Sequence, residues 1–411
     1  MTEGGKKKVN SEKGIARSEW KEFQLGDVVD IFDGPHATPK KTMTGDIFLG
    51  ISNLINGRID LAGAEYLSAD DYRKWTRRVE PRENDIVFSY ETKLGDAALI
   101  PSGLRFCLGR RMGLLRARNN LVDPRFLFYY YRAPVFQGVI QEHTVFGTTV
   151  DRIPLIDMPR FPICLPPLPE QRAIAGVLSS LDDKIDLLRR QDKTLEAMAE
   201  VLFRQWFVEE AGEERKEGTI ADLIEFNPTR KLSKGTIAPY LEMSSLSNTA
   251  FMPNAWYDRE FSSGTKFRNG DTLLARITPC LENGKTAYIT FLDDNQVAWG
   301  STEYIVMRPK EPIHPFFAYI LARINDFRDY AEGCLEGSSG RQRVNIDHLM
   351  KYQMAVPDRE SIMHFNSTIE SFIPKLQSNA QQIRTLEALR DTLLPKLMSG
   401  EVRVDMRAND A

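Results

Sequence analysis

The sequence is poor in the residues that build metal centres and disulfide frameworks. It has four cysteines and five histidines in 411 residues, and the cysteines form no CxxC pair. Scattered thiols of this kind are typical of a reducing compartment and argue against both disulfides and a zinc site. We therefore expect a cytoplasmic protein whose own chain holds no metal and no other cofactor.

Long hydrophobic runs and an excess of one charge are also missing. No stretch approaches the roughly 20 apolar residues that a membrane span needs. Residues 1–18 carry Lys6, Lys7 and Lys8 without the apolar segment of a secretory signal, so we interpret them as a disordered arm. The formal net charge is −3, so any basic surface must be local.

The chain contains an internal repeat of about half its length, and 411 residues exceed what one hydrophobic core usually holds. The turn and strand at Glu83–Tyr90 recur at Asn269–Arg276. In the same order, Gly147-Thr148-Thr149 matches Gly337-Ser338-Ser339, a Pro-bearing strand end follows, and Thr194–Met198 matches Thr385–Leu389. The common order and spacing indicate a duplicated chain.

Each half is predicted to contain a globular part and then a long helix. The globular parts show short β-like runs between Gly, Pro, Asn and Asp turns, such as Asp85–Tyr90 and Thr272–Arg276, and short helices such as Pro124–Tyr131. We expect an α+β fold with these segments: 1–18 arm, 19–165 first globular domain, 166–210 first long helix, 217–355 second globular domain, 356–400 second long helix and 401–411 tail.

Apolar residues in both predicted helices recur at a period of 3.5, which is typical of a coiled-coil seam. The first seam comprises Ile174, Leu178, Leu181, Ile185, Leu188, Leu195, Leu202 and Trp206, and skips Asp192 and Ala199. The second includes Ile369, Phe372, Leu376, Ile383, Leu386 and Leu393, and skips Asn379 and Arg390. A seam can pack on its own globular part, but two matching seams in duplicate halves favour packing on each other.

The duplication predicts how the helices are used. If a pseudo-twofold axis relates the halves, the helices run antiparallel and separate the two globular domains. A helix of about 38 residues is about 57 Å long, more than one turn of duplex DNA at about 34 Å. Pro374 lies inside the second helix and predicts a kink there.

Several segments, weak singly, together resemble the specificity subunits of type I restriction–modification systems over Trp20 to about Val404. They are Leu25–Val28, Gly34–Pro39, Gly50–Leu54, Asn84–Ser89, Leu165–Arg172, Phe226–Arg230, Asn269–Arg276 and Leu394–Gly400. The chain departs from the family at Pro357–Ser361, where a fuller Pro-Pro-Leu-Pro-Glu-Gln form is usual.

The resemblance implies a DNA-binding specificity subunit without catalytic activity. Each globular part would be a target-recognition domain for one half of a split, asymmetric site in double-stranded DNA. The helices would set the spacing and dock modification (methyltransferase) subunits, two in number. Those partners would carry adenine-N6 methylation with S-adenosylmethionine, and restriction (motor–nuclease) subunits would use ATP and Mg²⁺. Two alternatives are a DNA-reading subunit of another methyltransferase or restriction assembly, and a coiled-coil adaptor that binds only proteins.

Candidate DNA-binding residues are polar or basic and lie in predicted loops, since base edges and phosphates are contacted by such groups. In the first domain they are His36, Thr38, Lys40, Lys41, Tyr90, Thr92, Lys93, Arg110, Arg111, Thr148, Thr149 and Arg152. In the second they are Thr229, Arg230, Lys231, Lys234, Arg276, Thr278, Asn283, Lys285, Ser338, Ser339, Arg341 and Arg343. The Gly-Thr-Thr and Gly-Ser-Ser loops rank highest because they are duplicated.

Motifs of catalysis are not found. Asn227-Pro228-Thr229 lacks the Pro-Pro-Tyr/Phe continuation of an adenine methyltransferase motif. Asn283–Thr286 resembles the end of a phosphate-binding loop, but Pro279 stands where that loop needs glycine. We interpret this segment as a turn and expect no enzyme activity in the chain.

Overall fold

The computed structural model describes residues 20–36, 39–61, 63–118, 120–147, 150–209, 217–338 and 340–404. Contacts divide the chain into two units. Unit 1 holds the described residues up to Lys184 and those from Leu386 onward, and unit 2 holds Ile185–Thr385. Each long helix therefore contributes one segment to each unit, so the units differ from the two halves of the sequence.

Unit 1 is an α+β module. Its strands are β1 (Lys21–Gln24), β2 (Val29–Asp33), β3 (Asp46–Leu49), β4 (Leu54–Ile55), β5 (Arg58–Ile59), β6 (Glu65–Leu67), β7 (Ile86–Ser89), β8 (Ala97–Leu99), β9 (Phe106–Leu108), β10 (Met112–Ala117) and β11 (Pro162–Leu165). Its short helices are α1 (Leu25–Val28), α2 (Ala69–Trp75), α3 (Pro124–Arg132) and α4 (Pro134–His143), with 3₁₀ turns at Ile51–Asn53 and Met158–Arg160.

Unit 2 has a similar set of elements. Its strands are β12 (Ile224–Phe226), β13 (Ile237–Leu241), β14 (Tyr257–Glu260), β15 (Thr265–Phe267), β16 (Thr272–Ala275), β17 (Thr286–Tyr288), β18 (Ala298–Gly300), β19 (Tyr304–Pro309), β20 (Leu335–Glu336) and β21 (Arg343–Val344). Its short helices are α6 (Ile220–Leu223), α7 (Phe316–Arg323), α8 (Asn325–Gly333) and α9 (Ile346–Leu349), with a 3₁₀ turn at Met243–Ser245.

The sequence repeat is matched by a repeat of sheet topology. A four-stranded sheet of order β2-β10-β7-β8 in unit 1 corresponds to β12-β19-β16-β17 in unit 2. A second sheet pairs β3 antiparallel with β6 and parallel with β9, as β13 pairs with β14 and β18. The mixed α+β fold and the duplication are confirmed.

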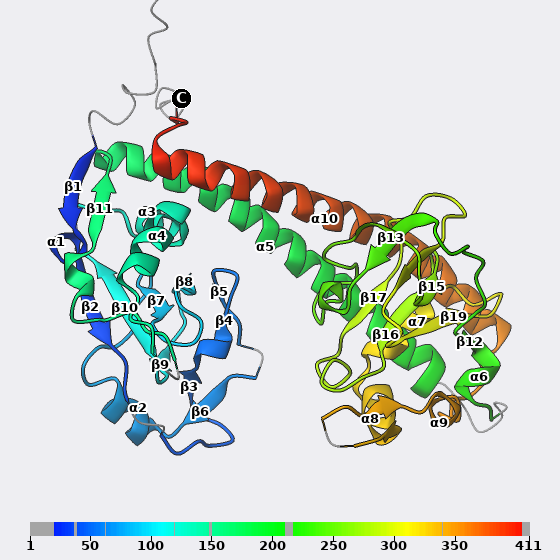
Figure 1. Ribbon diagram of the computed structural model, residues 1–411. Coiled ribbons are helices and arrows are strands. Elements are labelled where there is room, and N and C mark those ends of the chain that lie inside the picture. Colours follow the sequence, from blue (N-terminus) through cyan, green and yellow to red (C-terminus); the bar gives the residue numbers. More distant parts are fainter. Residues whose placement is uncertain are drawn as a thin grey trace, which may run out of the picture. The chain divides into compact units, whose positions relative to one another are not determined.

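The two long helices are α5 (Leu168–Arg204), which a π-helical turn at Gln205–Glu209 continues, and α10 (Arg359–Ser399). In each unit their segments lie side by side (Figure 1). In unit 2, Asn379 donates a hydrogen bond to Asp192 at 2.7 Å, and the Phe203 and Phe365 rings are 6.4 Å apart. Because the paired positions rise along one helix and fall along the other, the segments are antiparallel, as predicted.

The predicted seams are buried or half-buried at every predicted position, but they serve more than helix pairing. Ile174 and Leu178 belong to the hydrophobic core of unit 1, together with residues of its sheet and of α3. Near the end of α5 the buried side chains are Phe203 and Phe207, while Leu202 is only half-buried. Phe203 and Phe207, which are four residues apart, belong to the core of unit 2. An α-helix repeats every 3.6 residues, so a stripe of residues spaced at 3.5 drifts around the helix and other positions come to face the core.

Polar residues fill the steps that the hydrophobic pattern skips. Asp192 and Asn379 bind each other in unit 2, and Arg390 contacts Asp182 at 2.7 Å in unit 1. A polar pair in an apolar seam favours one register of the helices over others. Helix α10 continues on both sides of Pro374, and the kink there stays a prediction.

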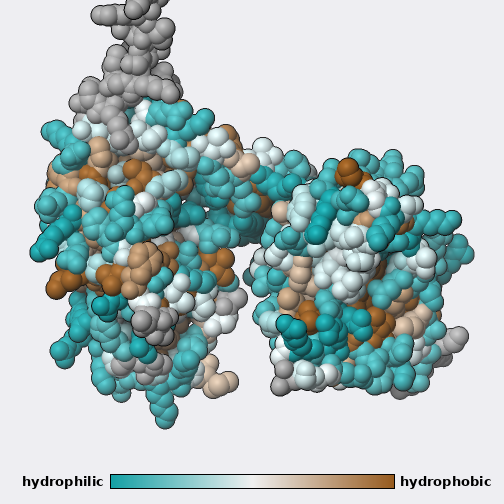
Figure 2. Space-filling model, in the orientation of Figure 1, coloured by the Kyte–Doolittle hydropathy of each residue, from teal (hydrophilic) through white to brown (hydrophobic). Residues whose placement is uncertain are grey.

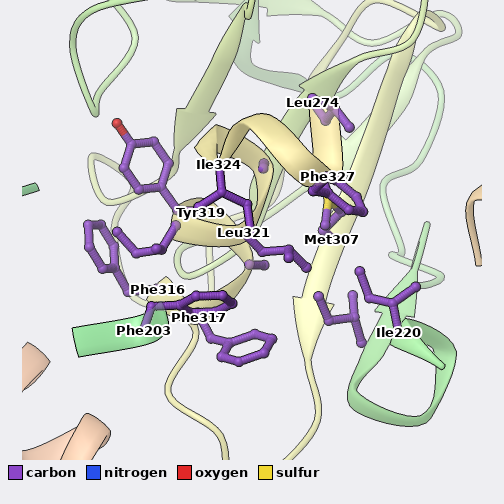
Figure 3. Close-up of a cluster of buried hydrophobic side chains, with 14 of the residues drawn as sticks. Phe203, Ile220, Leu274, Met307, Phe316, Phe317, Tyr319, Leu321, Ile324 and Phe327 are labelled. Atoms are coloured by element: carbon purple, nitrogen blue, oxygen red, sulfur yellow. The ribbon is translucent and has the colours of Figure 1, made fainter. Parts of the chain in front are cut away.

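The core of unit 2 forms where α7 packs on the sheet β12-β19-β16-β17 (Figure 3). Seven of the eight residues of α7 are buried, including Phe316, Phe317 and Tyr319. Phe203 from α5 contacts Phe317, with ring centroids 5.0 Å apart. Burial of each large apolar side chain contributes about 1.5–3 kcal/mol, so α5 is anchored to unit 2 through its aromatic residues.

Candidate nucleic-acid interface

One buried ion pair in each unit fixes the strand that leads to the candidate loops. In unit 1, Asp85 just before β7 accepts bonds from Arg116 on β10 at 2.9 and 2.6 Å. In unit 2, the fully buried Asp271 just before β16 contacts Arg308 on β19 at 3.2 Å. Burial raises the pKa of the Asp271 carboxyl, and the charge of Arg308 opposes that shift. These pairs hold equivalent strands in equivalent registers.

Hydrogen bonds gather four chain segments of unit 1 at the end of β7. The Tyr90 N–H donates to the Arg111 carbonyl at 3.2 Å, and the Ile153 N–H donates to the Tyr90 carbonyl at 2.9 Å. Glu91 and Arg152 form an isolated β-bridge. A side-chain bond from the Tyr90 hydroxyl to Asp33 adds the end of β2 to this cluster. These bonds bring the predicted residues Tyr90, Arg111 and Arg152 together.

The side chains of this loop cluster differ in their exposure and in their bonds to other residues. Tyr90 is buried, and burial together with the charge of Asp33 raises the pKa of its hydroxyl. Arg111 forms an ion pair with Glu91 at 2.9 Å, and His36 bonds Asp33 at 2.6 Å. Lys93, Arg110 and Arg152 are exposed. The first set therefore supports the loops, and the second can meet a polyanion.

Unit 2 repeats this arrangement with different side chains. The Arg276 N–H donates to the Glu303 carbonyl at 2.9 Å, the Val344 N–H donates to the Arg276 carbonyl at 2.9 Å, and Ile277 bridges Arg343. Arg276 therefore stands where Tyr90 stands in unit 1, and Arg343 stands where Arg152 stands. Unlike Arg152, Arg343 forms a bidentate ion pair, with bonds of 2.7–2.9 Å to the Glu303 carboxylate.

Other predicted residues of unit 2 also have bonds inside the unit. Arg230 contacts the buried Asp271 at 3.3 Å, and Lys285 donates to the Met243 carbonyl at 3.1 Å. The Thr278 hydroxyl accepts a bond from the Gln342 N–H at 3.1 Å. The predicted residues that remain exposed in unit 2 are Thr229, Lys231, Lys234, Asn283, Ser338, Arg341 and Arg343.

The remaining predicted residues fall into two groups. In unit 1, Lys40 and Thr92 are exposed, and Lys41 is ion-paired with Glu65 on β6 rather than joined to the loop cluster. Four predicted residues lie outside the described residues: Thr38, Thr148, Thr149 and Ser339.

The backbone pairing corrects the alignment of the duplicated loops, in which the sequence repeat matched Gly147 with Gly337. Val145 bridges Arg152 as Glu336 pairs with Arg343, so position 146 corresponds to Gly337.

A cavity of about 350 Å³ in unit 1 borders the Lys93 loop. Its polar lining includes Asn56, Lys93, Asp96, Arg132 and Gln137. Gly57 at the tip of the β4–β5 hairpin permits this arrangement, because a Cβ there would lie 2.4 Å from Arg132 Nη1. The mixed charges of the lining do not define one kind of ligand.

The described residues contain neither a candidate metal-binding cluster nor a candidate membrane span. Within the described ranges, no group of three or more His, Cys, Asp or Glu side chains could hold a metal ion. None of the helices in the part of the chain that the structure describes is long and apolar enough to cross a membrane.

Comparison with known proteins identifies the relatives of this fold. The family described as "Type I restriction modification DNA specificity domain" matches residues 17–197. The HindI specificity subunit of Haemophilus influenzae is 20% identical and covers 94% of this chain and all of the relative. The MjaIX specificity subunit of Methanocaldococcus jannaschii is 23% identical and covers 95% of both chains.

A solved structure has the same fold. The S subunit of a type I restriction–modification system from M. genitalium superposes with a TM-score of 0.54 at 18% identity, covering 92% of this chain and 96% of that one. The duplicated α+β units and the two antiparallel helices are the features of the fold that the two chains share. Over nearly its whole length the chain is similar to specificity subunits of type I restriction–modification systems, and residues 17–197 match the DNA specificity domain of that family.

Proposed function

We propose that this chain gives a type I restriction–modification complex its DNA sequence specificity, with each unit binding one half of a split, asymmetric site. The observation that carries the proposal is the duplicated loop cluster, in which equivalent backbone bonds present different side chains. Tyr90 in unit 1 is replaced by Arg276 in unit 2, and Lys93 is replaced by Pro279, four residues after the last residue of each strand. Similar scaffolds with unlike contacts suit two unlike half-sites.

The long helices would act as the spacer between the two readers. Helix α5 has 37 residues, so it is about 55 Å long at 1.5 Å per residue. That length exceeds one turn of duplex DNA, which is about 34 Å. The polar pairs Asp192–Asn379 and Asp182–Arg390 would fix the register of the helices and so the spacing.

The chain itself would be non-catalytic. Modification subunits, two per chain, would dock on the long helices and methylate adenine N6 with S-adenosylmethionine, and restriction subunits would cleave DNA with ATP and Mg²⁺. The complex would work in the cytoplasm. The sequence lacks the adenine-methyltransferase motif, which supports placing methyl transfer in a partner subunit.

Binding assays distinguish this function from the alternatives. We expect the chain, combined with the methyltransferase subunit encoded beside it, to bind duplex DNA with an affinity that falls steeply as salt rises. A protein-only adaptor would show negligible DNA binding even with that partner. Methyl transfer should require both subunits, and turnover by this chain alone would contradict a non-catalytic role.

A further inference from the structure

An exposed phenylalanine lies beside the loop cluster of unit 1. Phe146 is 74% exposed, and it is the only phenylalanine among the large hydrophobic side chains exposed in the described part of the chain. Figure 2 shows a mostly hydrophilic surface with hydrophobic residues in small patches. Leaving an aromatic ring of this size in water is unfavourable, so the ring is a candidate for contact with a ligand.

The backbone around Phe146 is held by hydrogen bonds. Val145 and Arg152 exchange two backbone bonds of 2.9 and 3.1 Å, and the Gly147 N–H donates to the Asp151 carboxylate at 3.2 Å. A Cβ on Gly147 would lie 2.5 Å from the Val150 carbonyl oxygen, so the turn is tight. The backbone that carries the ring is therefore held by hydrogen bonds within the hairpin.

Exposed basic side chains lie on this hairpin and on the segments bonded to it. Arg152 lies on it, and its β-bridge to Glu91 joins it to the loop that carries Lys93. The bond between Tyr90 and Arg111 brings in the segment that carries the exposed Arg110. Cationic side chains bind phosphates, and apolar side chains beside them contact or wedge between bases. An exposed ring with exposed basic side chains on its own hairpin and on the segments bonded to that hairpin fits a nucleic acid better than an apolar protein surface.

The equivalent hairpin of unit 2 lacks this ring. There, Glu336 occupies the position of Val145, and Gly337 occupies that of Phe146. Glu336 accepts a hydrogen bond from Asn345 at 2.9 Å and contacts His348 at 3.3 Å. Of the two equivalent hairpins, only that of unit 1 carries an exposed aromatic ring. Such a difference is expected if the ring contacts one of two unlike half-sites.

We propose that Phe146 stacks against a DNA base as a wedge at one base step of the half-site bound by unit 1. This inference rests on the proposed function, because it needs unit 1 to bind DNA. Aromatic stacking of this kind does not require a particular base, since every base has a π face. Phe146 would therefore strengthen binding and distort the duplex, while the polar loops select the sequence.

The test compares Phe146→Ala with Ile237→Ala in the full chain assembled with its methyltransferase subunit. Ile237, on β13 of unit 2, is a matched control because it is 72% exposed. The probe is a duplex that carries the split motif methylated in cells. We expect Phe146→Ala to weaken binding about tenfold, equivalent to about 1.4 kcal/mol, and Ile237→Ala to stay within twofold of the wild type.

A second pair of variants tests stacking directly. Phe146→Trp should bind within twofold of the wild type, and its added fluorescence should be quenched by the duplex, while that of Ile237→Trp should not. Unchanged affinity of Phe146→Ala, or unquenched Phe146→Trp, would overturn the proposal while leaving the proposed function intact. Loss of methyltransferase assembly in Phe146→Ala would assign the ring to a protein contact instead. Failure of the wild-type complex to bind the duplex would refute the proposed function itself.

Discussion

Replacing Asp192 by asparagine should stabilise the protein, and more so at high pH. Asp192 lies half-buried in the seam between α5 and α10 and accepts a 2.7 Å hydrogen bond from the fully buried Asn379. Burial raises the pKa of Asp192 to about 6, and the Asn379 hydrogen bond opposes that shift. Asn379 Oδ1 has no partner among the described residues, and an amide at position 192 could donate to it.

The sign of the pH dependence follows from the direction of this shift. The unfolded carboxyl titrates near 3.8 and the folded one near 6, so the stabilising contribution is present below about pH 4 and is lost as pH rises through 6. Complete loss of this contribution would lower the free energy of unfolding by about 3 kcal/mol. Solvent screening of a half-buried group reduces this effect to about 1–2 kcal/mol. Asp192→Asn should recover that amount at pH 8 and about half of it at pH 5.

Urea unfolding of the full chain at pH 5 and pH 8, followed by tryptophan fluorescence, measures both differences. Asp183→Asn is the control, because Asp183 is an exposed carboxyl on the same helix, and it should change stability little at either pH. A stabilisation by Asp192→Asn that is equal at both pH values would refute the reasoning. A loss of stability at pH 8 would refute it as well.

Three further variants test the framework and the loops. Arg390→Met should lower the free energy of unfolding by about 1–3 kcal/mol, because it removes the 2.7 Å ion pair of Asp182 and leaves that carboxylate with the Tyr129 hydroxyl and the more distant Arg58; an unchanged urea midpoint would contradict this. Gly113→Ala should cost about 1–3 kcal/mol, since the new Cβ would lie 2.5 Å from Phe88, and thermal unfolding measures it. Lys93→Ala should reduce the slope of log affinity against log salt by about 1 in DNA-binding titrations; an unchanged slope would remove Lys93 from the interface.

Much of the fold could be predicted because it depends on local patterns. The strands at Ile86–Ser89 and Thr272–Ala275 follow from short runs, rich in apolar residues, after turn residues, and α3 follows from Pro124 after the N-cap residue Asp123. The duplication is visible in the sequence because the structure needs the same turn twice. Both repeats have an aspartate at the equivalent position, Asp85 in the first and Asp271 in the second, because each forms an ion pair with an arginine on the neighbouring strand.

The roles of individual loop residues could not be predicted, because their partners are distant in sequence. Arg276 and Arg343 look like free cations, yet Arg276 donates to the Val344 carbonyl and Arg343 binds Glu303. Tyr90 likewise binds Asp33. Phe146 was missed for a related reason. Nothing in its sequence neighbourhood distinguishes an exposed ring from a core residue, and only its 74% exposure in the folded structure does so.

The end of the first seam shows a second limit. A 3.5-residue pattern places Leu202 and Trp206 in the seam, while the structure buries Phe203 and Phe207 in the core of unit 2. Both sets are apolar, so periodicity alone cannot select between a partner helix and a globular core. In the structure the two environments merge, because Phe203 and Phe207 contact both Phe317 of α7 and Phe365 of α10.

Methylome sequencing tests most directly the claim that each unit reads one half of a split site. Cells would express the chain with its methyltransferase subunit, and then a variant whose residues 217–355 come from another specificity subunit. The account predicts a bipartite methylated motif in which the exchange alters one half and preserves the other. A contiguous motif, or a change in both halves, would contradict it.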